Sequence, residues 1–532
     1  MSFSSERISY RETGAFTRIV VDYLEDAPAL RNFYDLRPDI EGIKTAVTQR
    51  AAYPVNRQLL VNILQQQYQG LNISQKLDAN VNALLSEDTF TVCTAHQPNI
   101  FTGHLYFIYK ILHAVKLADE LNIAIPGKKF VPVYYMGSED ADLEELGAIK
   151  VYGITYRWET KQSGAVGRMK IDKTFIELID AIEGQISVEP NGREVITALR
   201  ESYKKGTTVE DATFRFVHHL FNDLGLVILL PDNRELKNEF VPIVAKELEE
   251  HFSRKAVDKS MAEFPTAYKV QAAGRDINLF YLDNHSRERI WKEGNEFMLT
   301  DSRRKFTTDE ILSELKDNPE KFSPNVILRP VYQEMILPNV VFIGGGSELA
   351  YWLELKDVFT EAKAFFPVLM LRNSFTIVSK RVSPLLQKLQ LETPDIFHSE
   401  ASLLETIVAR HSKTKLDLEP EKEQLSSLYA KIKAAAVAVN APLGVHSAAL
   451  HMQALHKLEA LEKKMLKAEK KKFEAEQRQI AKIRASLYPT GVLQERSDNI
   501  LEYLATYGKD FLKTLYEHSQ GISTLFTVIT EL

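Results

Sequence analysis

Cysteine is almost absent from this chain of 532 residues. The single thiol, Cys93, excludes an intramolecular disulfide framework and a structural zinc site built from several thiolates. The chain also lacks any stretch of about 18 uncharged apolar residues, and its N-terminus lacks the apolar core of a secretion signal. We therefore expect a soluble protein of the cytoplasm, a reducing compartment, with no membrane partner.

An excess of positive charge is also lacking. Sixty-six basic residues face 72 acidic ones, which gives a formal net charge of -6. No overall positive field favours nucleic acid, so we expect no nucleic-acid partner, and any anion must be bound at a local site. The 45% of hydrophobic residues are enough for buried cores throughout, and domain-size statistics predict roughly two to four units.

Strand-like and helix-like segments alternate through the middle of the chain. Each of five apolar bursts leads into a polar or glycine-rich turn followed by helical spacing: 89–95, 130–136, 226–230, 340–343 and 368–371. The alternation predicts an α/β fold with a mostly parallel sheet, whose ligands bind beyond the carboxyl ends of the strands. Period-two patterns at 149–172 and 269–299 predict inserted antiparallel hairpins.

The composition of the chain changes after about Pro420. Residues 447–487 contain no Gly or Pro, and their apolar residues follow the 3-4-3 spacing of a coiled coil, with lysines and glutamates interleaved as on a solvated face. We expect four parts: an N-terminal helical segment at 1–87, a core at 88–415 with insertions near 149–205 and 245–325, a helical hairpin and coiled coil at 416–490, and a C-terminal segment at 491–532 that returns to the core.

The first candidate site is the loop HQPNIFTGH, between the first strand and its helix. Amide groups at a helix N-terminus are unpaired and favour phosphate or carboxylate. His96, His104 and Lys110 are available to strengthen that field, although Lys110 would serve equally well as a surface lysine. The alternative is that Asn99 or Thr102 only caps the helix.

The second candidate site is GSEDAD, which follows the second strand. Its carboxylates suit the ammonium group of an amino acid, a Mg²⁺ ion bridging phosphates, or the proton of an attacking amine. Helix capping by Ser138 or Asp140 is the alternative. Capping accounts less well for Glu139, because a capping box needs only one acid.

The third candidate site surrounds three glycines between a buried strand and a helix. Glycine permits φ > 0 and close approach of a ligand to the backbone. The turn is neither a Walker loop nor a dinucleotide fingerprint. The candidate residues of this region are Arg329, Gln333, Glu334, Gly344, Gly345, Gly346, Ser347, Glu348 and Tyr351. Cys93 lies inside an apolar strand, where a thiol is usually inert packing material.

Four segments resemble a known family. HQPNIFTGHLYFIYK, VPVYYMGSEDADLEEL, LRPVYQEMILPNVVFIGGGSELAYWLELK and YPTGVLQERSDNIL, in that order and with a coiled coil before the last, are similar to the cysteine ligases of bacillithiol biosynthesis, the BshC family. The match runs over nearly the whole chain. It implies a Rossmann-like core related to class I aminoacyl-tRNA synthetases and nucleotidylyltransferases, connecting-peptide insertions, and a coiled coil that forms a homodimer.

The resemblance implies a ligase that joins L-cysteine, through its carboxyl group, to the amine of glucosaminyl-malate. A carboxylate does not acylate an amine at neutral pH, so ATP or a related nucleotide, with Mg²⁺ as a further candidate, would activate it as an acyl-adenylate or acyl-phosphate. The implied catalytic residues are His96, His104, Glu139 and Asp140. The implied substrate-binding residues are Gln97, Gly103, Lys110, Ser138 and those of the third site, and the nearest substitutes for a nucleotide-binding signature are Arg372, Ser374, Lys380 and Arg381.

Within the resemblance, His96, Gly103 and His104 would steady phosphate charge, and Arg329 would bind the malyl carboxylates. Two alternatives remain. The same fold would suit a nucleotidylyltransferase that transfers AMP to a small molecule, and the coiled coil would suit a scaffold protein without catalytic activity.

Overall fold

The computed structural model describes residues 2–272, 274–412 and 417–532 and divides into two compact units. The sheet unit comprises Phe3–Ile377 and Val492–Ile529, and the helical unit comprises Val378–Gly491 with the short terminal pieces of the chain. Each unit is described by itself below. The four predicted parts and their boundaries stay predictions.

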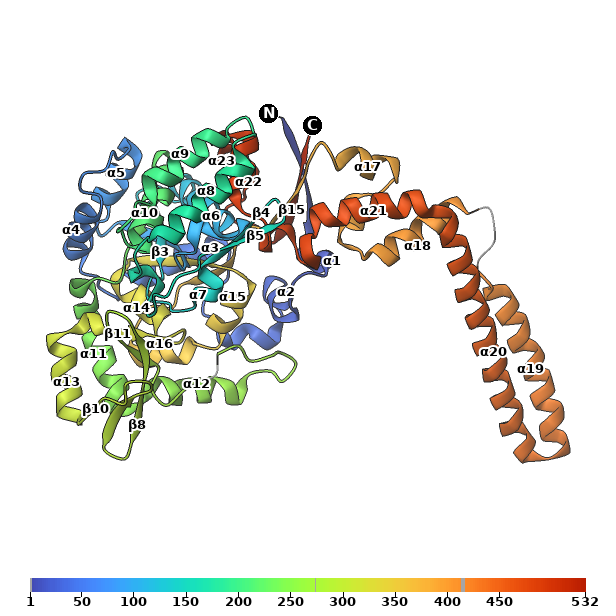
Figure 1. Ribbon diagram of the computed structural model, residues 1–532. Coiled ribbons are helices and arrows are strands. Elements are labelled where there is room, and N and C mark those ends of the chain that lie inside the picture. Colours follow the sequence, from blue (N-terminus) through green and yellow to red (C-terminus); the bar gives the residue numbers. More distant parts are fainter. Residues whose placement is uncertain (1, 273, 413–416) are drawn as a thin grey trace. The chain divides into compact units, whose positions relative to one another are not determined.

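A five-stranded parallel sheet forms the centre of the sheet unit (Figure 1). Its strands are β2 (Thr89–His96), β3 (Lys129–Met136), β6 (Val227–Leu229), β12 (Asn339–Gly344) and β13 (Val368–Leu371). They lie in the order β13-β12-β2-β3-β6, and every neighbouring pair is parallel. The first strand therefore lies in the middle and the winding reverses between β2 and β12, as at the switch point of a Rossmann fold. The predicted α/β fold is confirmed.

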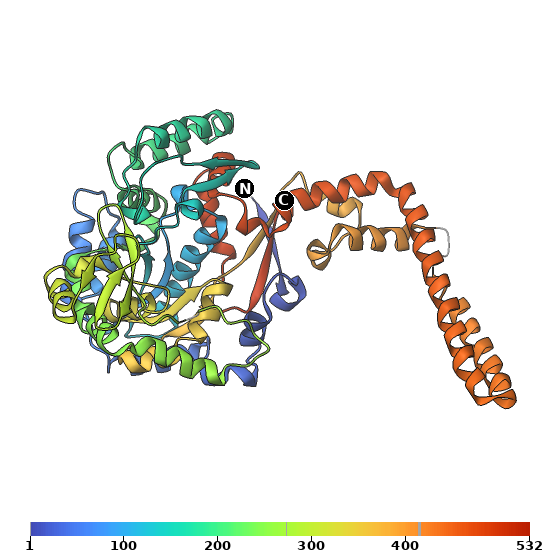
Figure 2. The same ribbon diagram turned by 60° about the horizontal axis from the view of Figure 1, so that its bottom comes forward.

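These strands are buried because their β-branched and aromatic residues pack between helices. Helix α6 (Leu105–Ala124) and helix α3 (Ile40–Arg50) share one apolar core with the sheet. Val92 of β2, Leu117 of α6 and Ile43 of α3 are all fully buried in it. Figure 2 shows the sheet and its helices from another side. This packing holds the carboxyl ends of the strands at one edge of a rigid core.

The predicted antiparallel hairpins are present, and they form sheets of their own. Strands β4 (Ala148–Val151) and β5 (Ile154–Arg157) pair with each other. A second sheet has the order β10-β9-β8-β7-β11, with bounds Leu279–Leu282 for β7, Arg287–Glu293 for β8, Glu296–Leu299 for β9, Lys305–Phe306 for β10 and Phe322–Pro324 for β11.

A third small sheet was not predicted. It joins β1 (Phe3–Ser9), β15 (Leu525–Glu531) and β14 (Phe375–Val378) in the order β1-β15-β14. The N-terminal segment, expected to be helical, therefore opens with a strand. Short strands from opposite ends of a chain find their partners only in the folded state, so their local signal is weak.

The other helices of the sheet unit surround these sheets. Their bounds are α1 (Tyr10–Thr13), α2 (Arg18–Leu24), α4 (Arg57–Gln67), α5 (Gln75–Ala83), α7 (Leu143–Leu146), α8 (Lys173–Ile186), α9 (Gly192–Ser202), α10 (Val209–Phe221), α11 (Arg234–Glu250), α12 (Phe252–Glu263), α13 (Thr308–Asp317), α14 (Arg329–Ile336), α15 (Gly346–Leu353), α16 (Lys356–Ala362), α22 (Ile500–Tyr507) and α23 (Asp510–His518).

The helical unit contains the predicted hairpin and coiled coil. Helices α19 (Glu419–Val439) and α20 (Ala441–Lys470) run side by side and turn at Asn440, and a 3-10 turn separates α20 from α21 (Glu474–Leu487). The predicted breaker at 440–444 is shorter than expected, because Pro442 and Gly444 already lie inside α20. Helices α17 (Ser383–Lys388) and α18 (Glu400–His411) complete the unit.

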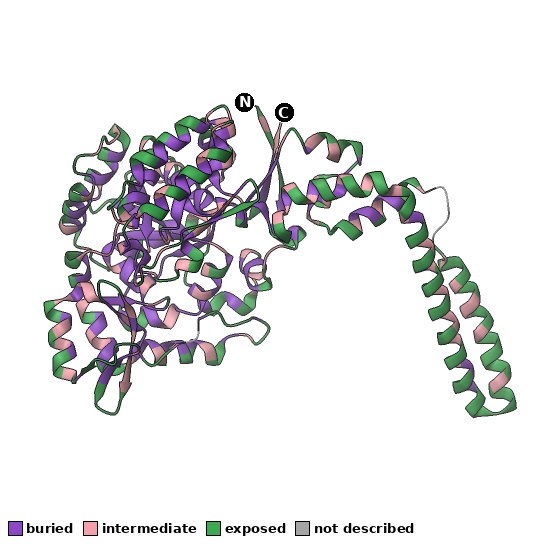
Figure 3. Ribbon diagram, in the orientation of Figure 1, coloured by how far each residue is buried: buried purple, intermediate pink, exposed green. Residues whose placement is uncertain are grey.

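Most of the hairpin surface is open to solvent (Figure 3). Helix α19 has no buried residue, and α20 has three along its 30 residues. Most lysines and glutamates of this region are thus on a solvated face, as the sequence predicted, whereas Glu469 is buried. Across the described parts of the chain, no helix combines the length and apolar character needed to cross a membrane.

Candidate functional site

The loops that follow β2 and β3 meet at the carboxyl edge of the sheet. The amide of Gly137 donates to the carbonyl of His96 at 2.8 Å, and the Tyr134 hydroxyl donates to the same carbonyl at 3.1 Å. In the same two loops, Gln97 Nε2 of the loop after β2 donates to Asp140 Oδ2 of the loop after β3 at 3.2 Å. The structure therefore brings the first two candidate sites together.

A buried ion pair spans the switch point between β2 and β12. Lys110 of α6 is 2% exposed, donates to the carbonyl of Ala95 at 2.9 Å, and pairs with Glu348 in the first turn of α15. Glu348 also accepts from the amide of Gly345 at 2.8 Å. The interpretation of Lys110 as a surface lysine is wrong, since its ammonium joins the first candidate site to the third.

The three consecutive glycines lie close to neighbouring side chains. None of Gly344–Gly346 has a positive φ, so the turn does not use the left-handed backbone that glycine permits. A Cβ on Gly344 would lie 2.9 Å from the Phe342 ring, and a Cβ on Gly345 would lie 3.7 Å from Arg372 Nε. The Phe342 ring therefore leaves no room for a side chain at Gly344, whereas a Cβ at Gly345 would make only ordinary contact with Arg372.

Arg372, directly after β13, is held by a buried carboxylate. Its Nη1 and Nη2 donate to the two oxygens of Glu495 at 2.9 and 2.6 Å, and Nη1 also donates to Ser374 Oγ at 2.9 Å. The guanidinium lies over the Tyr106 ring, and its buried Nε has no hydrogen-bond partner. Of the other predicted nucleotide residues, Ser374 is at this site, whereas Lys380 is exposed and belongs to the helical unit.

The two histidines of the first loop flank one aromatic ring. His96 ends β2, and His104 is the N-cap of α6, one position before the expected first turn. Their ring centroids lie 5.5 and 5.8 Å from that of Tyr106. Burial lowers the pKa of both imidazoles, and nearby Lys110 lowers that of His96 further. A neutral imidazole can donate or accept a hydrogen bond. It does not supply the positive charge with which the two histidines were predicted to steady phosphate.

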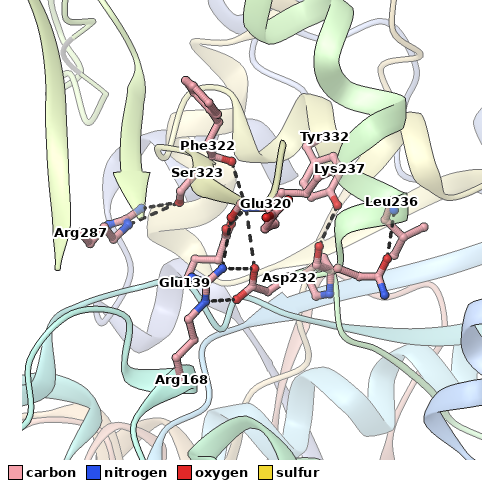
Figure 4. A network of polar contacts seen from close by, with 12 residues as sticks. Glu139, Arg168, Asp232, Leu236, Lys237, Arg287, Glu320, Phe322, Ser323 and Tyr332 are labelled. Atoms are coloured by element: carbon pink, nitrogen blue, oxygen red, sulfur yellow. Dashed lines mark hydrogen bonds and ion pairs between the residues drawn. The ribbon is translucent and has the colours of Figure 1, made fainter. Parts of the chain in front are cut away.

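The acidic loop after β3 leads into a charged network (Figure 4). Glu139 pairs with Lys237 of α11, which also donates to the carbonyl of Phe322 at 2.9 Å. Asp232, just after β6, accepts two hydrogen bonds from Arg168 at 2.7 Å each. Burial raises the pKa of Glu139, and Lys237 opposes that shift. The network thus buries the side chains of Glu139, Asp232 and Lys237 and leaves that of Arg168 partly exposed.

Helix capping does not explain this loop in the way that the sequence allowed. The cap of α7 is Asp142, whose carboxylate accepts from the Glu145 amide at 3.1 Å. Ser138 is buried, and Asp140 interacts instead with the loop after β2. Glu139 has no capping role, and its carboxylate forms an ion pair with Lys237.

A second guanidinium reaches the acidic loop from the inserted sheet. Arg287 of β8 stacks on the Phe280 ring at 3.9 Å and lies 3.6 Å from Asp140 Oδ1. Its Nε and Nη2 approach Ser323 Oγ at 3.4 Å. These distances exceed the 2.7–2.9 Å of strong charge-assisted hydrogen bonds, so Arg287 keeps donor capacity.

Arg329 of α14 has neutral partners only. Its Nη1 and Nη2 donate to Gln333 Oε1 and Tyr351 Oη, each at 3.2 Å, and its guanidinium lies 5.6 Å from the Tyr135 ring centroid. Among the described residues, no carboxylate forms an ion pair with it. A half-buried guanidinium of this kind is suited to a carboxylate or phosphate of a ligand.

The remaining residues of the third candidate site differ in burial. Glu334 Oε1 accepts from Gln333 and Asn339, and burial raises the pKa of Glu334 to about 7. Ser347 is exposed at the start of α15. Cys93 is fully buried in β2, and burial raises its thiol pKa, as expected for packing material.

Six residues of this region were missed in the sequence: Arg168, Asp232, Lys237, Arg287, Glu495 and Asn499. Asp232 had a usable signal, since it follows the third strand of the sheet as closely as the candidate acids follow the second. Glu495 and Asn499 lie in the segment QERSDN, which carried part of the resemblance without a role. For Arg168 and Arg287, no local pattern points to the site.

The predicted site residues, all of which the structure describes, do not form a metal-binding cluster among themselves. Within residues 2–272, 274–412 and 417–532, no group of three or more His, Cys, Asp or Glu side chains is placed to hold a metal ion. A Mg²⁺ ion brought by nucleotide phosphates stays a prediction.

Comparison with known proteins decides the family. Residues 3–373 match the model of "Bacillithiol biosynthesis BshC, N-terminal Rossmann-like domain", and residues 375–531 match "Bacillithiol biosynthesis BshC, C-terminal coiled-coil domain". The chain belongs to the BshC family. The Rossmann-like domain and the coiled coil that the sequence predicted are both confirmed by these matches.

BshC relatives match the chain at full length. The protein of Flavobacterium johnsoniae is 35% identical over 98% of this chain and 99% of its own, and that of Christiangramia forsetii is 36% identical over 98% of both. Both bear the name "Putative cysteine ligase BshC". A solved structure titled "Crystal structure of putative arginyl t-RNA synthetase from Campylobacter jejuni" covers 85% of this chain and 100% of its own at 11% identity. The TM-score of this match is 0.24.

Proposed function

We propose that this BshC protein is a ligase that forms an amide between the carboxyl group of L-cysteine and the amine of glucosaminyl-malate, giving bacillithiol. The observation that carries the proposal is full-length similarity, at 35% and 36% identity, to relatives named as cysteine ligases. The charged site at the carboxyl ends of the parallel strands adds support, because Rossmann folds bind ligands at this edge.

The substrate charges fit the charges of the site. Arg329 has no acidic partner among the described residues, and its planar fork matches a malyl carboxylate. Glu139 and Asp140 would hold the cysteine ammonium. Binding there would compete with Lys237 for Glu139, so ligand binding and the network of Figure 4 would be linked.

The residues also fit a nucleotide, which would supply the activation of the cysteine carboxylate. The buried Nε of Arg372 and Nε2 of His96 have no hydrogen-bond partners, and both nitrogens lie in side chains that touch the Tyr106 ring. The amides of Gly346 and Ser347 at the start of α15 would add donors. Lys110 balances Glu348, so its charge is already used within the protein.

The test is incubation of the purified protein with cysteine, glucosaminyl-malate and ATP, with mass spectrometry for the conjugate. Arg329→Gln should raise the KM for glucosaminyl-malate more than that for cysteine, and Glu139→Gln should do the reverse. Lys422→Ala, in the helical hairpin, is the matched control and should change neither constant. Equal effects of both site variants on both substrates would contradict the assignment.

The alternatives give different products. A nucleotidylyltransferase would consume ATP without forming a new thiol conjugate. A scaffold would keep its cellular role in the Glu139→Gln variant and lose it when residues 447–487 are deleted. In a deletion strain, the ligase proposal predicts that glucosaminyl-malate accumulates.

The helical hairpin is proposed to form a homodimer. Along α19 and α20, several large apolar side chains are 41–54% exposed: Leu428, Ile432, Val437, Leu443, Leu450, Met452 and Leu461. A second copy of the hairpin would cover them. Light scattering of the full chain should give twice the monomer mass, and Leu428→Glu with Leu461→Glu should give the monomer mass.

A further inference from the structure

The loop between β2 and α6 has an uncommon backbone. Three successive residues, Phe101, Thr102 and Gly103, have φ of 49°, 71° and 66°. Positive φ is rare for residues other than glycine, and a β-branched threonine in this region is a true outlier. Such a conformation persists only when its surroundings over-determine it, and it concentrates at functional sites.

The surroundings that hold this loop come from the segment 497–499. Asn499 is fully buried, and its Nδ2 donates to the carbonyls of Phe101, at 3.0 Å, and Gly103. The amide of Leu105 donates to the Asp498 carbonyl at 2.9 Å. One side-chain amide therefore joins two carbonyls of the strained loop, and the backbone beside it fixes the start of α6.

The same segment fixes the proton of His104. The Nδ1 atom lies 3.3 Å from the carbonyl oxygen of Ser497. A carbonyl oxygen only accepts hydrogen bonds, so Nδ1 carries the proton. Burial lowers the pKa of His104, the Ser497 hydrogen bond opposes that shift in part, and Lys150 adds to it, so the neutral ring is favoured. Nε2 is then unprotonated, and among the described residues no group donates to it.

We propose that His104 Nε2 accepts the proton of the attacking amine, and that Asn499 is the positioning residue that holds His104 in this tautomer and place. The inference rests on the proposed amide-forming function and changes the expected role of His104 from phosphate contact to proton acceptor. A neutral imidazole is the usual base at physiological pH.

The proton accounting of the step is simple. The amine nitrogen bonds to the carbonyl carbon of a cysteine acyl group activated as a mixed anhydride with phosphate. The bond from that carbon to the phosphate oxygen breaks, and the oxygen leaves with the electron pair. The proton from nitrogen passes to His104 Nε2, and solvent later removes it from the ring.

The first test needs no substrate. The full-length protein is labelled with ¹⁵N-histidine, His104→Gln assigns the His104 signals, and the ¹⁵N shifts at pH 7 report which ring nitrogen carries the proton. We expect protonated Nδ1 and unprotonated Nε2. The reverse tautomer, or a protonated ring, would overturn the inference whether or not the protein proves to be a ligase.

The second test uses a matched pair of asparagines. Asn499→Asp replaces the donating NH₂ by an oxygen that faces two carbonyls. Asn80→Asp makes the same change at a site that is 1% exposed, where Nδ2 donates to the Gly225 carbonyl at 2.7 Å. Both should lower the unfolding midpoint, and only Asn499→Asp should give a mixture of His104 tautomers.

The rate of amide formation by the two variants then separates a loss of positioning from a loss of stability. Relative to Asn80→Asp, Asn499→Asp should lower kcat about tenfold to 100-fold with KM nearly unchanged, because the base is misplaced and the binding groups are not. Equal kcat in the two variants, with the wild-type tautomer in both, would refute the positioning role. If the wild-type protein forms no amide at all, the proposed function fails, while the tautomer measurement still decides the state of His104.

Discussion

Both the sheet unit and the helical hairpin contain an ion pair between a basic residue and a glutamate, but the two pairs differ in exposure. The side chains of Arg372 and Glu495 are 3% and 0% exposed, whereas those of Lys422 and Glu462 are 16% and 27% exposed. When one partner of a buried pair is removed, the other is left as an uncompensated charge. In the hairpin, water replaces the lost partner. The same attraction therefore maintains a site in one region and contributes little in the other.

The largest effect is expected for Glu495→Ala. Arg372 would keep a buried positive charge without its carboxylate, which should lower the free energy of unfolding by about 3–5 kcal/mol. All three tryptophans lie in the sheet unit, so tryptophan fluorescence in urea follows this unit. The double variant Arg372→Met/Glu495→Leu, which removes both charges, should recover much of the loss. A loss below about 1 kcal/mol would erase the contrast with the hairpin.

An intermediate effect is expected for Arg168→Met. Its side chain is 29% exposed, while that of its partner Asp232 is 5% exposed, so water compensates only in part. Loss of the two charge-assisted hydrogen bonds should cost about 1.5–3 kcal/mol in the same urea experiment. Arg168→Lys keeps the charge but not the planar fork, and it should fall between wild type and Arg168→Met. If Arg168→Met lowers the free energy of unfolding as much as Glu495→Ala does, the exposure of an ion pair does not determine how much it contributes to stability.

Glu334 should make stability depend on pH. Burial raises its folded pKa from the ordinary 4.5 to about 7, so the folded state binds a proton that the unfolded state releases between those values. The sign follows: stability is fully present below pH 4.5 and falls as pH rises toward 7, by up to about 1.4 kcal/mol per pH unit. Glu334→Gln should flatten this part of the curve measured by urea unfolding from pH 5 to 8. An unchanged slope in the variant would assign the pH dependence to other groups.

The smallest effect is expected for Lys422→Ala. Lys422 pairs with Glu419 and Glu462, whose side chains are 63% and 27% exposed, so water can solvate both carboxylates when the lysine is removed. Its removal should leave the thermal midpoint of the helical unit unchanged within error, as followed by circular dichroism at 222 nm. A clear decrease would show that hairpin pairs act as a network, and the comparison with the sheet unit would then need revision.

Much of the fold was accessible from the sequence because it depends on local periodicity. The five apolar bursts became the five strands of the parallel sheet, and the long run without glycine or proline became most of α20, a 3-10 turn and α21. Because parallel strands end at one edge, the residues after β2, β3 and β12 were expected to lie together. Their contacts at Gly137, Asp140 and Glu348 agree with that expectation.

What the sequence did not provide are partners far apart in the chain. Arg372 and Glu495 are separated by 123 positions, and nothing near either residue predicts the other. The sequence left open whether Lys110 is a surface lysine, because only the fold places Glu348 beside it. The strand β1 escaped detection for the same reason, since its neighbour β15 lies at the other end of the chain.

The burial of Cys93 has a chemical consequence. A protein proposed to handle cysteine and to release a thiol has its own sulfur sealed in the central strand, in the thiol form because burial raises its pKa. A cysteine or a thiol product of the proposed reaction would then not be trapped on the protein through sulfur–sulfur exchange, since a thiolate is the nucleophile that such exchange requires. Thiol-alkylating reagents should therefore leave the folded protein unmodified at Cys93 and label it once the protein unfolds.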